Sequence, residues 1–159
     1  MKKQLLVFIT VLLFCNLAVQ KVSAAELNLQ NDIYVASTEA LCFGRSNCFF
    51  NDTSDQQESN ALTKAIKYAR DNNLSNPSIY ILSPYEINSH TIVVDYPVTL
   101  IGQNGGWIST SNSDCSRPMF SITTNATVRD IYLNDGACSS PSRDLLAVNA
   151  AATVLVEHS

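Results

Sequence analysis

The chain has 159 residues, of which 46% are hydrophobic and 15% charged, and its formal net charge is −4. This length accommodates one domain, or one domain with a processed segment. Five Gly and five Pro exclude collagen-like and Gly/Pro-rich disordered chains. The acidic balance argues against a nucleic-acid partner, because phosphates require a basic surface. The two His and the scattered Cys form no ligand pattern, so neither a metal nor another cofactor is expected.

The first 25 residues have the layout of a secretory signal peptide. Lys2 and Lys3 precede an apolar run from Leu5 to Val19, and small residues follow at positions 23–25. The run has 15 residues, whereas a membrane span needs ~20, so cleavage is favoured over a stable membrane anchor. We expect a secreted protein, whether extracellular, periplasmic or on the cell surface. Without residues 1–25 its net charge is −7, from 7 Lys and Arg against 14 Asp and Glu.

Four cysteines remain after this cleavage, namely Cys42, Cys48, Cys115 and Cys138. An even number in an exported chain predicts two disulfides. Three connectivities are possible, and we favour the pairing of nearest neighbours because Cys42 and Cys48 enclose a short polar turn. Free thiols and a zinc site are the alternatives, but for zinc the spacing is not Cys-x-x-Cys and no His lies near either pair.

Three nine-residue windows of the second half align, at 92–100, 120–128 and 146–154, with offsets of 28 and 26 residues. Each has apolar residues at its first and third positions, then a turn, then a small or apolar residue, Thr and an apolar residue. This pattern predicts two short strands joined by a corner. The repeat favours stacked solenoid coils over a β-sandwich with chance similarity between its strands.

Stacking of the windows predicts ladders of side chains on successive coils. The expected inward ladders are Ile92/Phe120/Leu146, Val94/Ile122/Val148, Val98/Ala126/Ala152 and Leu100/Val128/Val154. Equivalent positions also hold Thr99, Thr127 and Thr153, and one corner holds Asp95, Thr123 and Asn149. Coils ~4.8 Å apart suit the ~4.4–6.8 Å Cα separation of a disulfide, so Cys115–Cys138 would join neighbouring coils.

A helix is expected before the repeat, from Gln57 to Asp71, with a capping box at Ser54 and Gln57. Its apolar face comprises Ala61, Leu62, Ala65, Ile66 and Ala69. The opposite face carries Lys64, Lys67 and Arg70, which we interpret as solvated charges rather than a binding patch. Such a helix would cover the open apolar end of the first coil.

Five segments in chain order resemble the start of secreted right-handed parallel β-helix proteins of the pectate-lyase-like superfamily. They lie at 60–70, 79–82, 84–87, 91–94 and 97–102. The resemblance runs from about Ile33 to the C-terminus, and it implies a mainly β solenoid with an N-terminal amphipathic capping helix. One departure is Ser83-Pro84, where the family often has a Pro-Gly step. The superfamily includes pectin lyases, pectin esterases and polygalacturonases as well as uncharacterised surface proteins.

Three regions are therefore expected: a signal peptide at 1–25, a strand, disulfide turn and capping helix at 26–77, and the first coils of a β-helix at 78–159. The pattern at 152–159 predicts an uncapped strand, so we expect further coils, with end-to-end self-association or aggregation as the alternatives. The family's catalytic residues lie on later coils, and no catalytic motif can be carried over. The resemblance implies a protein that acts on or binds polysaccharide; the alternative is a non-catalytic, adhesin-like surface module.

Three residues remain as candidates for direct contact with a ligand. Trp107 follows two glycines and is placed to stack on a sugar, although a lone Trp more often packs against the protein. Asp130 and Glu157 follow equivalent strands one register apart, so they form a candidate acid pair for glycoside chemistry. Solvated edge charges are the alternative interpretation of this pair, and the one we favour.

Overall fold

The computed structural model describes residues 31–52, 60–82, 84–87, 91–104, 106–110, 117–134 and 145–157. The chain divides into two units, 1–30 and 31–159, and all described residues belong to the second. Several predictions therefore concern residues outside the described ranges: the signal peptide at 1–25, the capping box of Ser54 and Gln57, and the Cys115–Cys138 disulfide.

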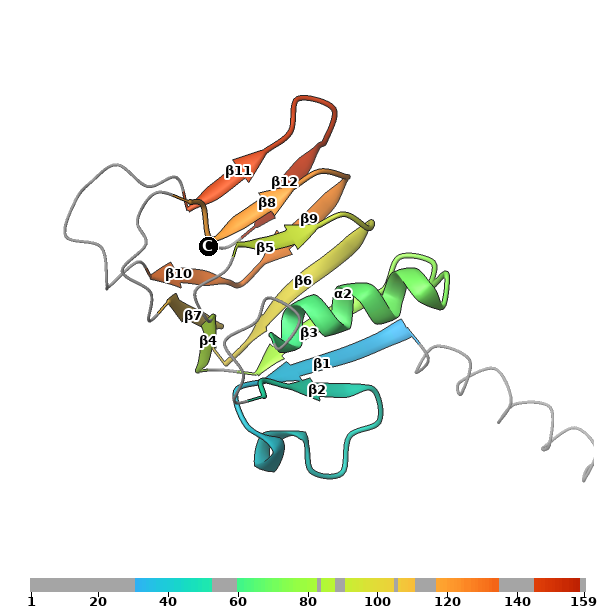
Figure 1. Ribbon diagram of the computed structural model, residues 1–159, viewed down its shortest axis with the longest axis vertical. Coiled ribbons are helices and arrows are strands. Elements are labelled where there is room, and N and C mark those ends of the chain that lie inside the picture. Colours follow the sequence, from blue (N-terminus) through green and yellow to red (C-terminus); the bar gives the residue numbers. More distant parts are fainter. Residues whose placement is uncertain are drawn as a thin grey trace, which may run out of the picture. The chain divides into compact units, whose positions relative to one another are not determined.

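The second unit is mainly β (Figure 1). Its strands are β1 (Asp32–Ala36), β2 (Cys48–Phe50), β3 (Ser78–Leu82), β4 (Tyr85–Ile87), β5 (Ile92–Val94), β6 (Val98–Gln103), β7 (Trp107–Thr110), β8 (Phe120–Ile122), β9 (Ala126–Arg129), β10 (Tyr132–Asn134), β11 (Leu146–Val148) and β12 (Val154–Glu157). The described helices are the 3-10 helix η2 (Glu39–Cys42) and the α-helix α2 (Ala61–Asp71).

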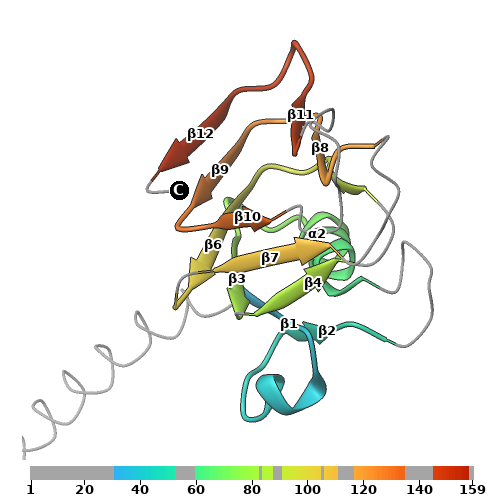
Figure 2. The same ribbon diagram turned by 90° about the vertical axis from the view of Figure 1, so that its left-hand side faces the viewer.

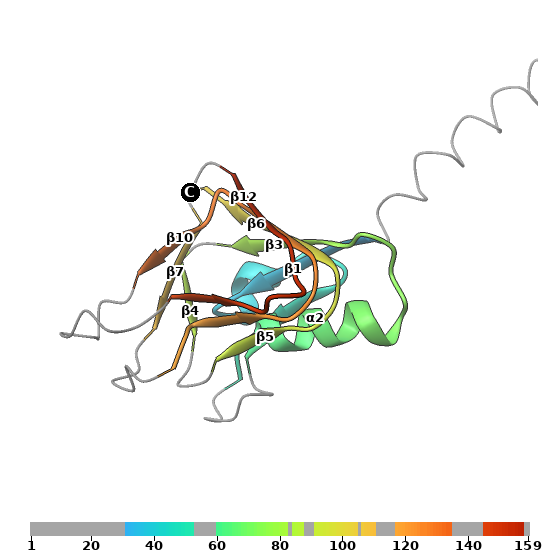
Figure 3. The same cartoon turned by 90° about the horizontal axis from the view of Figure 1, so that it is seen from above.

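The strands form three sheets in which every described pair is parallel. Sheet A has the order β12-β9-β6-β3-β1-β2, sheet B the order β10-β7-β4 and sheet C the order β11-β8-β5. From β3 onward the chain enters sheets A, B and C in turn, and each new strand joins the one from the previous visit. The three sheets line three sides of one core (Figure 3).

The register of sheet C confirms the first two predicted ladders. Phe120 pairs with both Ile92 and Leu146. Ile122 pairs in the same way with Val94 and Val148. In sheet A, Val98 pairs with Ala126 and Thr99 with Thr127, again as the repeat predicts. These pairs keep alternate apolar residues on the inner face, which is the period-two rule of a strand.

The last strand departs from the prediction by two residues. Ala126 pairs with Val154 rather than Ala152, and Leu155 rather than Thr153 lies opposite Thr127. The pairing of Val128 moves likewise, from Val154 to Val156. The corner at 149–153 causes this shift because it is two residues longer than the corners that precede β6 and β9. A shift of two preserves the alternation of inner and outer faces, so the sheet tolerates it.

Two asparagines hold this longer corner. The Asn149 side-chain oxygen accepts a hydrogen bond from the Ala151 amide at 3.1 Å, which is an Asx turn within the corner. Asn125 lies in the preceding corner, between β8 and β9, and its side-chain oxygen accepts a hydrogen bond from the Thr153 amide at 3.0 Å. These two bonds satisfy the Ala151 and Thr153 amides, and β12 begins after the corner in the shifted register.

The helix is confirmed, but it begins later than predicted. Asn60 has extended backbone angles (φ −71°, ψ 126°) and its side chain caps the Leu62 amide, so α2 starts at Ala61 rather than Gln57. All five residues of the predicted apolar face are buried, namely Ala61, Leu62, Ala65, Ile66 and Ala69. The helix lies beside β5 and contacts β1 and β2, which extend sheet A alongside it (Figures 1 and 3).

The last strands of sheets A and C expose apolar side chains, which the sequence predicts for residues 152–159 but not for Val148, an expected member of an inward ladder. Val148 is 45% exposed, Leu155 53% and Val156 50%. Among the described residues, β11 and β12 are edge strands, each paired on one side alone. This edge presents unpaired backbone groups together with apolar surface.

Candidate functional site

An aromatic pair stands on the outer face of sheet B, which faces the viewer in Figure 2. Trp107 on β7 pairs with Tyr132 on β10 in the strand register, so the two side chains lie on one row. Their ring centroids are 5.4 Å apart and their planes differ by 19°. If the rings lay directly face to face, their centroids would be ~3.5–4.0 Å apart. The stack is therefore offset, and part of each ring face is uncovered.

Both rings are accessible to a ligand. Trp107 is 41% exposed and Tyr132 is 60% exposed. The residues next to them in the chain explain this orientation. Ile108 follows Trp107 and is fully buried, and Ile131 precedes Tyr132 and is 3% exposed. Alternation along β7 and β10 therefore turns the aromatic rings outward.

A polar row runs beside the aromatic row on the same outer face. Ser109 on β7 pairs with Glu86 on β4 and with Asn134 on β10. Glu86 is exposed, while Ser109 and Asn134 are partly exposed. The two rows are two residues apart along the strands, which is ~7 Å. A carboxylate, a hydroxyl and an amide thus occupy the row next to the aromatic pair.

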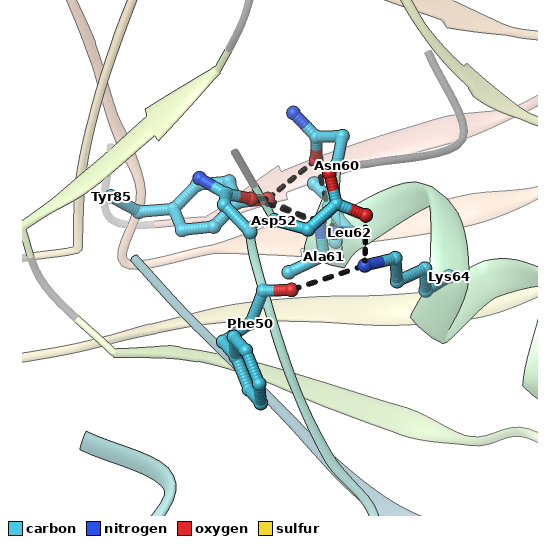
Figure 4. Close-up of polar contacts among 8 residues, drawn as sticks. Phe50, Asp52, Asn60, Ala61, Leu62, Lys64 and Tyr85 are labelled. Carbon is cyan, nitrogen blue, oxygen red and sulfur yellow. Dashed lines mark hydrogen bonds and ion pairs between the residues drawn. The ribbon is translucent and has the colours of Figure 1, made fainter. Parts of the chain in front are cut away.

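Beneath this face, Tyr85 connects sheet B to the start of α2 (Figure 4). Its side chain points inward from β4 and is fully buried. The hydroxyl accepts a hydrogen bond from the Leu62 amide at 3.0 Å and donates to the side-chain oxygen of Asn60. It also lies 3.1 Å from the side-chain oxygen of Asn51.

Burial raises the pKa of the Tyr85 phenol above its usual range, and hydrogen bonds from the Leu62 and Ala61 amides offset part of that rise. The phenol is therefore neutral and serves as a hydrogen-bonding group. Asn51 completes the network, because its side chain accepts from the Ala61 amide at 2.9 Å and donates to the Glu86 carbonyl at 2.9 Å. These bonds fix the backbone of β4 at the residue that contributes the carboxylate of the polar row.

Glu157, half of the predicted acid pair, lies next to a cation. It pairs with Arg129 in the strand register, and Glu157 Oε2 is 3.8 Å from Arg129 Nε. Asp130 follows β9 with a left-handed backbone (φ 55°) and donates its amide to the Glu157 carbonyl at 3.1 Å. The backbones are thus adjacent, and the joint acid–base role of the two carboxylates stays a prediction.

A second aromatic row lies on the outer face of sheet A, next to the Cys42–Cys48 disulfide. This disulfide is present, as predicted, with an S–S distance of 2.08 Å. Arg45 lies in the loop that the disulfide closes, and its guanidinium carbon is 4.6 Å from the centroid of the Tyr34 ring. Tyr34 in turn stacks on Tyr80, with centroids 5.3 Å apart. The row packs largely against itself, through cation–π and ring contacts.

The charged face of α2 is largely paired with carboxylates. Lys64 Nζ lies 3.2 Å from Asp52 Oδ2, and Arg70 forms an ion pair with Asp95 at the corner after β5. A groove of about 340 Å³ runs between this face and β5. The carboxylates offset its positive charge, which supports the interpretation of a solvated face.

The repeat pattern did not reveal Tyr132, Glu86, Ser109 or Asn134 as neighbours of Trp107. The three windows cover strands of sheets A and C, whereas these residues lie on sheet B. A signal was present, since a 25-residue offset aligns Trp107-Ile-Ser109 with Tyr132-Leu-Asn134. Three residues are too few to distinguish that alignment from chance without the register.

Comparison with protein-family models, with curated proteins and with solved structures found no match. The resemblance to pectate-lyase-like proteins therefore rests on the sequence motifs. Within the described ranges, no helix has the length and apolar character needed to cross a membrane. The same residues contain no group of three or more His, Cys, Asp or Glu placed to hold a metal ion.

Proposed function

We propose that this protein is a secreted, right-handed parallel β-helix of the pectate-lyase-like type that binds polysaccharide through the outer face of sheet B. The observation that carries the proposal is the offset, solvent-accessible stack of Trp107 on Tyr132. Aromatic faces pack against the C–H faces of sugars, and Trp and Tyr lose little conformational entropy in doing so.

The strand order supports the β-helix part of the proposal. Parallel strands of sheets A, B and C recur in the same sequence three times from β3 to β11, as expected of stacked coils. The position of α2 beside β5, with its apolar face buried, supports its role as an N-terminal cap. The Cys42–Cys48 disulfide suits an oxidising compartment and hence the proposed export.

Binding, rather than turnover, is the activity that this face suits best. The polar row of Glu86, Ser109 and Asn134 offers both donors and acceptors beside the aromatic pair. A sugar stacked on the rings could satisfy its hydroxyl groups against that row. The protein would then be a non-catalytic glycan-binding module on or outside the cell.

The test is the affinity of the purified protein for a panel of soluble oligosaccharides, measured by titration calorimetry. Trp107→Ala and Tyr132→Ala should each weaken binding by about tenfold or more, as for a central interface residue. Phe43→Ala is the matched control, because Phe43 is 92% exposed and lies in the disulfide loop. Equal losses in all three variants, or no loss in the first two, would refute the proposal.

Export is tested separately, by N-terminal sequencing of protein recovered outside the producing cell. A mature start at Ala25 or Glu26 is expected. Material that retains Met1 or Lys2 would rule out the signal peptide.

A further inference from the structure

On the basis of the proposed function, we infer that the outer face of sheet B selects uncharged glycans and disfavours uronic-acid polymers. The charge and the hydrogen-bonding groups beside the aromatic pair decide which class of glycan this face accepts. Glu86, Ser109 and Asn134 form that polar row, and they are joined to one another by the strand register.

The charge on this face has one sign. Glu86, which is exposed on β4, is the charged residue of the two rows. Among the described residues, neither row contains a Lys or an Arg. Its negative charge agrees with the balance of the chain beyond residue 25, where 14 acidic residues outnumber 7 basic ones. A polymer with one carboxylate per sugar would meet repulsion both at the face and on approach.

The neutral members of the row match hydroxyl groups. The Asn134 amide offers two donors and an acceptor, and the Ser109 hydroxyl offers one donor and two acceptor lone pairs. Neighbouring strands are ~4.8 Å apart, which is comparable to the length of one hexose. A glycan that crosses β7 and β10 would place successive sugars over Trp107 and Tyr132, with their hydroxyls toward Ser109 and Asn134.

Contacts on both sides of Glu86 fix its backbone in the fold. The Glu86 carbonyl accepts from the Asn51 side chain at 2.9 Å, and the side chain of the preceding residue, Tyr85, is fully buried. Because the backbone of β4 is anchored on both counts, the Cα atom of Glu86 stays in the row opposite Ser109. The selectivity should therefore reside in this one side chain.

The experiment compares a neutral β-glucan hexasaccharide with a hexagalacturonate of equal length, at low salt, using the purified protein. Wild type should bind the neutral ligand more tightly. Glu86→Gln should strengthen hexagalacturonate binding by roughly two- to fivefold, the range of one exposed charge, and the gain should vanish at high salt. Glu39→Gln, an exposed carboxylate on η2, is the matched control and should change neither affinity.

The outcomes separate this inference from the proposed function. Tighter binding of hexagalacturonate, still lost in Trp107→Ala, would overturn the selectivity and leave glycan binding intact. A Glu86→Gln variant indistinguishable from Glu39→Gln would also overturn it. Binding of neither ligand, or binding insensitive to Trp107→Ala, would refute glycan binding at this face and the inference with it.

Discussion

The carbonyl oxygen of Asp130 lies so close to Gly102 that a β-carbon added at Gly102 would come within 2.0 Å of it. The same β-carbon would lie 2.7 Å from the Cα atom of Gly106. Three backbone segments therefore meet where β6 leads into β7, and the contact is possible because position 102 has no side chain. This corner sets the position of β7 and hence of Trp107.

Gly102→Ala should destabilise the protein by about 3 kcal/mol or more, because backbone atoms cannot move aside as a flexible side chain would. Gly44→Ala is the control: Gly44 has a φ of +76° but its β-carbon would meet nothing within 4 Å. Its cost should be about 1 kcal/mol, from backbone strain alone. Urea denaturation measures both values, and a larger loss at Gly44 would contradict the crowding at Gly102.

Tyr85→Phe should cost about 1–2 kcal/mol in the free energy of unfolding. The substitution preserves the ring but removes the hydroxyl that accepts from the Leu62 amide and bonds to Asn60. Tyr132→Phe is the control, because Tyr132 is 60% exposed. Denaturant melts of both variants test the prediction, which fails if the two substitutions cost the same.

The raised pKa of Tyr85 predicts a loss of stability in alkali. Below pH ~10 the phenol is protonated in both states, so it adds no pH dependence. Above pH ~10 the unfolded state releases this proton while the folded state retains it, and stability falls by ~1.4 kcal/mol per pH unit. Tyr85→Phe should lack this component. Parallel alkaline slopes for wild type and Tyr85→Phe, followed by circular dichroism, would contradict it.

Replacing both Cys42 and Cys48 by Ala should destabilise the protein by about 2 kcal/mol, the entropic value for so short a loop. Non-reducing peptide mapping of wild type should yield one peptide pair that links Cys42 to Cys48. The same map tests the predicted Cys115–Cys138 bond. A peptide linking Cys42 to Cys115, or Cys48 to Cys138, would exclude the nearest-neighbour pairing.

Asn125→Ala should loosen β12 without unfolding the rest of the sheet. The substitution removes the side-chain oxygen that accepts from the Thr153 amide at 3.0 Å, immediately before β12 begins. Hydrogen exchange should accelerate at Val154–Glu157 and remain slow in β6. Asn125→Asp, which keeps a side-chain oxygen able to accept from the Thr153 amide, is the matched control. Unchanged protection of β12 would show that the corner does not depend on Asn125.

The sequence by itself determined the elements whose signal is local and periodic. Alternation of apolar residues identified the strands at 92–94, 98–100, 120–122 and 126–128 and their register, since burying one face permits only one alignment of equal repeats. Helical spacing identified the buried face of α2. The short polar turn between Cys42 and Cys48 identified that disulfide.

Tertiary structure decided what depends on groups far apart in the chain. The start of α2 is fixed by Asn60 together with Tyr85, which lies 25 residues further on, and no local pattern contains that contact. The longer corner at 149–153 shifts the register of β12 by two residues, and Asn125 of the preceding corner bonds to it, so a comparison of windows placed Thr153 two residues out of position. The neighbours of Trp107 are likewise set by strand pairing, because residues on adjacent parallel strands meet across loops whose lengths the pattern alone does not constrain.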